Sequence, residues 1–104
     1  MKRKISMVKH IILWKLKEDC NTDAVKRGIK ESLEALHGKI EGLLEIKVEC
    51  EPLPSSNADV MLYSVFEDEA ALGGYAVHPE HVKAADEKVR PYTAERSCFD
   101  YKEN

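Results

Sequence analysis

The sequence is poor in the features that stabilise many small proteins without a large hydrophobic core. Only three of its 104 residues are cysteines, Cys20, Cys50 and Cys98. Neither their odd number nor their spacing suggests a disulfide framework or a zinc knuckle, so we expect reduced thiols. The chain also lacks an apolar run that could cross a bilayer, and the run at residues 11–14 is too short for a signal peptide. We therefore predict a cytoplasmic protein without a membrane partner.

Concentrated positive charge is scarce as well. The formal net charge is −3, whereas nucleic-acid-binding domains usually carry a basic face. Lys2, Arg3 and Lys4 form a short basic run, which we interpret as a solvated N-terminus. We expect no nucleic-acid partner.

The composition is that of an ordinary globular domain, with 43% hydrophobic and 34% charged residues. The length predicts a single domain spanning residues 1–104. A domain of this size buries only about 60–70% of the surface of its unfolded chain, so a core shared with a second copy would help.

Hydrophobic patterning predicts four strands, at residues 7–16, 44–51, 60–66 and about 95–101. The second of these is amphipathic, whereas the first and third are apolar on both faces. Strands with two apolar faces are usually buried on both sides.

Spacing and capping residues predict the helices. Apolar residues recur at helical spacing over residues 25–40, after a cap at Asn21 or Thr22. Gly42 suits the end of this helix.

A second helix begins after Asp68, and the Gly73-Gly74 pair is expected to end or bend it. A third runs from Pro79 to about residue 89.

The order βαββαβ predicts an α+β, ferredoxin-like fold with helices on one face of the sheet. Four apolar residues of the first and third strands are expected on the other face, where they would leave a large patch in water: Ile12, Trp14, Leu62 and Phe66. A second copy laid face to face is the economical cover, so we predict a homodimer.

Three segments resemble a known family. Residues 7–17, MVKHIILWKLK, are similar to the opening strand of stress-responsive A/B barrel domains. Residues 75–82, YAVHPEHV, resemble the central motif of these domains, and Arg96 with Asp100 and Tyr101 resembles their closing strand. This resemblance covers nearly the whole chain and implies a dimeric α+β barrel with a cavity in each subunit.

The resemblance also implies candidate catalytic residues. One branch of the family includes a plant polyketide cyclase that works without cofactor or metal, and its catalytic tyrosine and histidine would align with Tyr75 and His81. Its cavity histidine on the first strand would align with His10. Other members are stress-associated proteins or have no assigned activity, and a non-catalytic dimer is therefore the alternative.

The residues expected to bind a ligand are His10, Ile12, Trp14, Leu62, Ser64, His78, Arg96 and Cys98. Ser64 and Arg96 make this cavity more polar than that of the cyclase, and Trp14 is expected to shorten it. These departures argue against a long-chain polyketide substrate.

The chemistry of His81 and Tyr75 favours proton transfer. At the start of a helix the dipole lowers the pKa of an imidazole, and a neutral imidazole can act as a general base. Tyr75 could then donate a hydrogen bond to the resulting enolate. In the alternative interpretation, both side chains only wedge the helix against the sheet.

The other titratable residues allow more than one role. His78 precedes Pro79 and is expected mainly to cap the helix or fasten the loop. His10 alternates with Ile12 and Trp14 and is expected to point at the open face of the sheet, where a lone histidine is more often a hydrogen-bonded core residue than a ligand. A metal held by His10, His78 and His81 is conceivable in principle, but no carboxylate at a familiar spacing joins them, so we expect no metal or other cofactor. Arg96, if buried, needs an acidic partner or an anionic ligand.

These observations lead to two hypotheses. In the first, a homodimeric α+β barrel binds a small polar or aromatic carbonyl compound and catalyses cofactor-free cyclase-, isomerase- or lyase-type chemistry. In the second, the protein is a non-catalytic, stress-associated dimer that binds a ligand or serves a structural role.

Overall fold

The computed structural model describes residues 6–103, so the basic run at Lys2, Arg3 and Lys4 lies outside the described part. Its strands are β1 (Met7–Leu16), β2 (Leu43–Glu49), β3 (Val60–Phe66) and β4 (Thr93–Glu103). Its helices are α1 (Asp23–Glu34), α2 (Glu69–Val77) and α3 (Pro79–Ala84), with shorter turns η1 (Glu18–Cys20), η2 (Ala85–Val89) and η3 (Arg90–Tyr92). None of the helices within residues 6–103 has the length and apolar character needed to cross a membrane.

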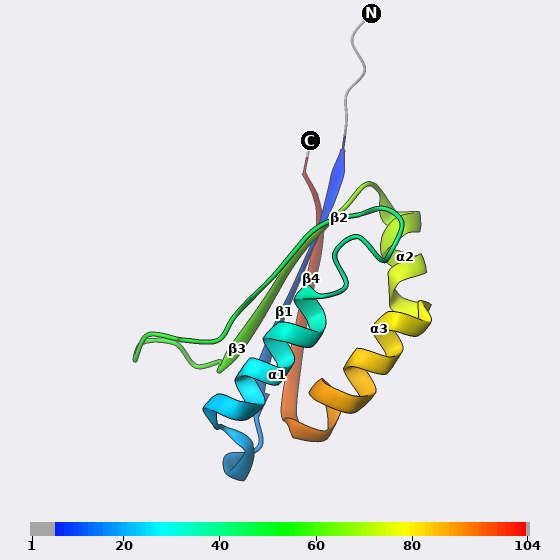
Figure 1. Ribbon diagram of the computed structural model, residues 1–104. Helices are drawn as coiled ribbons and strands as arrows, with labels where there is room; N and C mark the ends of the chain where they lie inside the picture. Colours follow the sequence, from blue (N-terminus) through cyan, green and yellow to red (C-terminus); the bar gives the residue numbers. More distant parts are fainter. Residues whose placement is uncertain (1–5, 104) are drawn as a thin grey trace, which may run out of the picture.

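The strands form one antiparallel sheet in the order β2-β3-β1-β4, and the helices pack on one of its faces (Figure 1). The predicted α+β, ferredoxin-like fold is thus confirmed, including the central position of β1 and β3. All four predicted strands are present, and β4 is longer at both ends than expected.

The first helix ends earlier than predicted, at Glu34 rather than near Gly42. Residues 35–42 form turns in which Leu36 and Ile40 are still buried, so the apolar spacing continues although the helix does not. Gly38 and Gly42 both have a positive φ, of 85° and 84°, which residues with a side chain rarely adopt. The turn therefore depends on these glycines.

The second helix, by contrast, continues through Gly73 and Gly74 to Val77, so the two glycines do not end it. The Asp68 carboxylate caps its start by accepting a hydrogen bond from the Ala71 N–H, 2.8 Å away. The buried side chain of Tyr75 anchors its end. Tertiary packing here outweighs the low helix propensity of glycine.

The prediction that Ile12, Trp14, Leu62 and Phe66 lie on the uncovered face was also wrong. All four are buried beneath the helices, with at most 6% of their surface exposed. Period-two alternation shows which residues share a face of a strand, but it does not show which face the helices cover. When both faces are apolar, the sequence gives little to decide between them.

The uncovered face is nevertheless apolar. Pairing across the sheet places Ile11 beside Tyr63 and Phe99, and Leu13 beside Met61. Phe99 is 67% exposed, and its ring lies 5.7 Å from that of Tyr101. At the edge of this group, the Lys9 ammonium donates to the Tyr63 hydroxyl at 2.6 Å and lies 3.2 Å from the Glu103 carboxylate.

We expect Gly42→Ala to lower the free energy of unfolding by about 2 kcal/mol or more, because it combines two costs. The positive φ of 84° strains any side chain, and the new Cβ would stand 2.4 Å from the Cβ of Ala71. Chemical denaturation of the variant and the parent protein measures the difference.

Two further glycines provide controls for this measurement. Gly38→Ala meets no atom within 4 Å and tests the positive φ alone, whereas Gly73→Ala lies in a helix with open space around it. We expect Gly73→Ala to be neutral or to stabilise the protein by up to about 1 kcal/mol. Equal stability of Gly42→Ala and the parent would contradict the described turn.

Candidate active site

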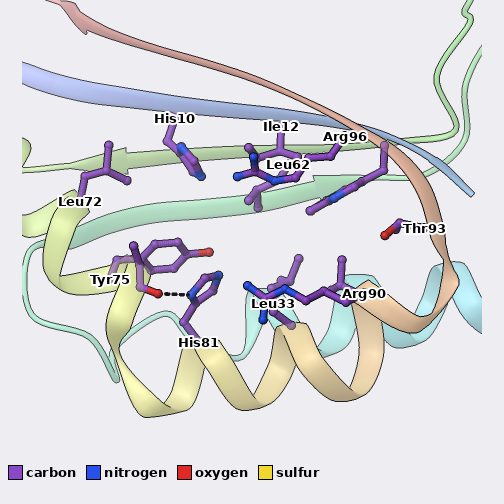
Figure 2. A pocket seen from close by; sticks show the side chains of 14 residues that line it. His10, Ile12, Leu33, Leu62, Leu72, Tyr75, His81, Arg90, Thr93 and Arg96 are labelled. Carbon is purple, nitrogen blue, oxygen red and sulfur yellow. Dashed lines mark hydrogen bonds between the residues drawn. The ribbon is translucent and has the colours of Figure 1, made fainter.

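A pocket with a volume of about 360 Å³ lies between the sheet and the helices (Figure 2). Its sheet wall consists of His10, Ile12, Trp14, Leu62, Thr93 and Arg96. The wall formed by helices and turns consists of Leu33, Leu72, Tyr75, Ala76, His81, Ala85, Val89 and Arg90. Segments far apart in the sequence thus bring aliphatic, aromatic and cationic side chains around one space.

Most of the residues predicted to bind a ligand or act on it line this pocket: His10, Ile12, Trp14, Leu62, Tyr75, His81 and Arg96. Ser64 does not: it is fully buried on β3 beside His10, and its hydroxyl donates to the backbone oxygen of His10. Cys98 is exposed on β4. His78 lies at the start of α3, where its Nδ1 accepts a hydrogen bond from the Glu80 N–H.

His10 faces the helices, and not the uncovered face of the sheet as predicted. Its Nδ1 lies 2.5 Å from the Asp100 carboxylate, which stands directly opposite on β4. A carboxylate accepts, so Nδ1 of His10 donates the proton of this hydrogen bond. Sequence analysis did not pair Asp100 with His10, because the register that joins them is not visible in the residue pattern.

Tyr75 is a deeply buried polar residue of the pocket, and burial changes the pKa of its hydroxyl. Its side chain is 2% exposed, and its hydroxyl has no hydrogen-bond partner within residues 6–103. Burial raises the pKa of this phenol well above its usual range, against a smaller opposite effect of the Arg96 charge. The hydroxyl therefore stays protonated at neutral pH and is a donor without an acceptor, which is rare in a folded protein.

The imidazole of His81 stacks on the Tyr75 ring, with centroids 4.1 Å apart and an interplanar angle of 30°. Its Nδ1 lies 3.3 Å from the backbone oxygen of Ala76 in α2, drawn as the dashed line in Figure 2. A carbonyl only accepts, so Nδ1 donates the proton of the neutral ring and Nε2 keeps a free lone pair.

The pKa of His81 is lowered, chiefly by burial. The hydrogen bond to Ala76 opposes this effect, and the positive charges of Arg90, His10 and Arg96 add to it. The sequence predicted the same direction from the dipole of the helix, but burial and nearby cations are the causes here. A neutral imidazole at neutral pH follows from them.

Arg90 also lines the pocket, although sequence analysis did not single it out. It follows Val89, near which the third helix was expected to end, and η2 and η3 instead continue helical turns to Tyr92. Its guanidinium forms an ion pair with Asp86 one turn earlier. The signal that could have found it is this spacing of four residues between an acidic and a basic side chain.

The fold brings together one group within residues 6–103 with the composition of a metal site: His10, Cys98 and Asp100. His78 and His81 do not belong to it. The separation of 2.5 Å between His10 and Asp100 is that of a hydrogen bond, whereas two ligands of one zinc ion stand about 3 Å or more apart. These donors therefore fit a histidine–carboxylate pair better than a metal.

Known structures with the same fold include several described as dimers. A dimeric protein of unknown function and ferredoxin-like fold from Bacteroides fragilis is 37% identical, with a TM-score of 0.83 over 91% of this chain and 94% of that one. A Dabb family protein from Mesorhizobium loti is 22% identical, with a TM-score of 0.74 over 92% and 95%. Hydroxynitrile lyase from Passiflora edulis is 17% identical, with a TM-score of 0.80 over 94% of each chain, a likeness that shows the fold alone.

Among curated proteins, no sequence matches this one. The profile of a family does: that of Dabb, the stress responsive A/B barrel domain, matches residues 8–103. This match spans both sheet and helices and includes every residue of the pocket. The chain therefore belongs to the stress responsive A/B barrel domain family.

Proposed function

We propose that the protein is a homodimer whose pocket catalyses proton transfer on a small carbonyl compound without a cofactor. One observation carries this proposal: the buried, unpartnered hydroxyl of Tyr75 lies beside a neutral His81 in an apolar pocket. A buried donor without a partner costs free energy, and a bound acceptor would recover it. The oxygen of a carbonyl compound is such an acceptor.

The reaction begins when Nε2 of His81 removes a proton from the carbon next to the carbonyl. The electrons of the C–H bond move into the new carbon–carbon double bond, and the carbonyl oxygen becomes an enolate that accepts a hydrogen bond from Tyr75. The imidazolium then returns the proton to the same or another carbon, so no oxidant or reductant is needed. The raised pKa of Tyr75 keeps its proton on the phenol throughout.

A non-catalytic dimer is the second candidate, favoured by the contacts that His81 makes. Its bond to Ala76 joins α3 to α2, and its ring covers that of Tyr75, so the pair also holds the helices together. The two candidates differ over the hydroxyl of Tyr75. It contributes no hydrogen bond to stability, and it is required for the proposed chemistry.

The dimer forms, in this proposal, through the uncovered face of the sheet. The exposed Phe99 and Leu13 would leave water there, and the Bacteroides fragilis relative is itself dimeric. All three cysteines are free thiols, which favours a reducing compartment, the cytoplasm.

We expect Phe99→Glu to convert the protein to a monomer, because it places a charge in the apolar interface. Light scattering at micromolar concentration measures the mass. Val77→Glu is the matched control, since Val77 is similarly exposed, at 75%, but lies in α2 away from the sheet. A monomeric parent protein, or a dimer that survives Phe99→Glu unchanged, would contradict this interface.

The general base is tested by proton exchange. In D₂O, we expect the protein to accelerate loss of the benzylic proton signal of phenylpyruvate or 1-phenylbutan-2-one, and His81→Gln to slow it by about 10²-fold or more. Because the base must be neutral, the rate should rise with pH through the lowered pKa of His81, with a midpoint below 6.5, and then level off. Unchanged exchange in His81→Gln would exclude it as the base.

Tyr75→Phe separates the two candidates. Since the phenol makes no hydrogen bond, its removal should leave the melting temperature unchanged or raise it. Loss of one oxyanion donor should slow exchange by about 10²- to 10³-fold. A lower melting temperature with unchanged exchange would instead support the structural role.

A further inference from the structure

Two guanidinium groups extend into the pocket from opposite walls, Arg96 from β4 and Arg90 from η3 (Figure 2). Both stand close enough to His81 for their charges to lower its pKa, and Arg96 acts on Tyr75 in the same direction. The two cations thus line the same pocket as the proposed base and oxyanion donor.

Both arginines are exposed, and their positive charge meets no acidic side chain in the lining of the pocket. Within residues 6–103, Arg96 forms no ion pair with a carboxylate, since the carboxylate of Asp100 is bonded to His10 and Glu95 lies opposite Lys15 on the other face of the sheet. Arg96 interacts with the thiol of Cys98, whose pKa is raised chiefly by burial, so this partner carries no charge at neutral pH.

Arg90 has a partner, but an exposed one. Its ion pair with Asp86 spans one helical turn, and both side chains are more than half exposed. Exposed pairs of this kind contribute little to stability, so a second anion can share the guanidinium at small cost.

We propose that the pocket binds small oxo acids, with Arg96 and Arg90 holding the carboxylate and the apolar walls holding the rest of the molecule. The planar guanidinium matches a carboxylate through two parallel hydrogen bonds. Ile12, Leu33 and Leu62 supply an aliphatic surface for an apolar or aromatic tail. The carbonyl part of this inference rests on the proposed proton transfer. The carboxylate part does not, because it is argued from the two arginines.

The arrangement also selects the position of the carbonyl. Both arginines line the same pocket as His81 and Tyr75, so a small molecule whose carboxylate lies between the two guanidiniums would extend its adjoining carbons toward that pair. A carbonyl next to the carboxylate, or one carbon further along, then faces the phenol. The ligand must therefore carry both a carboxylate and a carbonyl group that can enolise, and 2-oxo and 3-oxo acids carry both.

Binding is tested without turnover by titrating phenylacetate and its neutral isostere phenylacetamide into the dimeric protein, with isothermal calorimetry as the readout. We expect phenylacetate to bind at least about tenfold more tightly than phenylacetamide. Arg96→Gln should weaken phenylacetate binding about tenfold or more, and Arg90→Gln by a smaller factor. Neither change should affect phenylacetamide.

Arg27→Gln is the matched control, because Arg27 is exposed on α1 and its substitution removes the same charge at a position away from the pocket. Equal affinities of the acid and the amide, or equal losses in Arg27→Gln and Arg96→Gln, would overturn the proposal. Tighter binding of phenyl phosphate than of phenylacetate would overturn the proposal that the ligand is a carboxylate, and would indicate a phosphate-bearing ligand instead.

A second measurement locates the ligand. Chemical-shift changes in the amide spectrum should concentrate on pocket residues such as Thr93 and Leu72, and changes confined to other surfaces would overturn the site. Failure of the proton-transfer proposal has a different signature. In that case phenylacetate still binds and responds to Arg96→Gln, while phenylpyruvate shows no exchange above its spontaneous rate.

Discussion

The pairing of β1 with both of its neighbours is the constraint on which the rest of the structure depends. β1 lies between β3 and β4, so each of its residues has a fixed partner on either side. This register places His10 opposite Asp100 and Trp14 opposite Arg96, and it directs both histidine and arginine toward the helices. A slip of one residue would move this set to the other face and dismantle the site. The chemistry of the pocket is therefore fixed first by backbone hydrogen bonds.

Because β1 and β3 are apolar on both faces, the same strands serve two surfaces. One face forms the core beneath the helices and one wall of the pocket, and the other carries Ile11, Leu13 and Phe99. A sheet covered on one side only cannot leave such a face in water without cost. The apolar uncovered face and the pocket are thus two consequences of one strand pattern.

The sequence could predict the fold well because its signals are local. Alternation marked β1 and β3, and Asp68 and Pro79 marked helix starts that the structure confirms. It failed where long-range packing decides: which face the helices cover, where α1 ends, and whether Gly73 breaks α2. The site followed the same division. His81 and Tyr75 are close in sequence and both line the pocket, whereas the pairing of Asp100 with His10 and the approach of Arg90 depend on register and on turns.

The site also shows how one environment can set two protonation states in opposite directions. Burial disfavours charge, so it lowers the pKa of His81 and raises that of Tyr75, leaving an unprotonated base next to a protonated donor. The cations of Arg90 and Arg96 reinforce the first effect and that of Arg96 opposes the second, but burial is the larger cause for both. A neutral base in contact with a neutral acid is what enolisation at neutral pH requires. The arginines would then act mainly on the ligand, since a bound carboxylate offsets part of their charge and leaves burial as the larger influence on the pair.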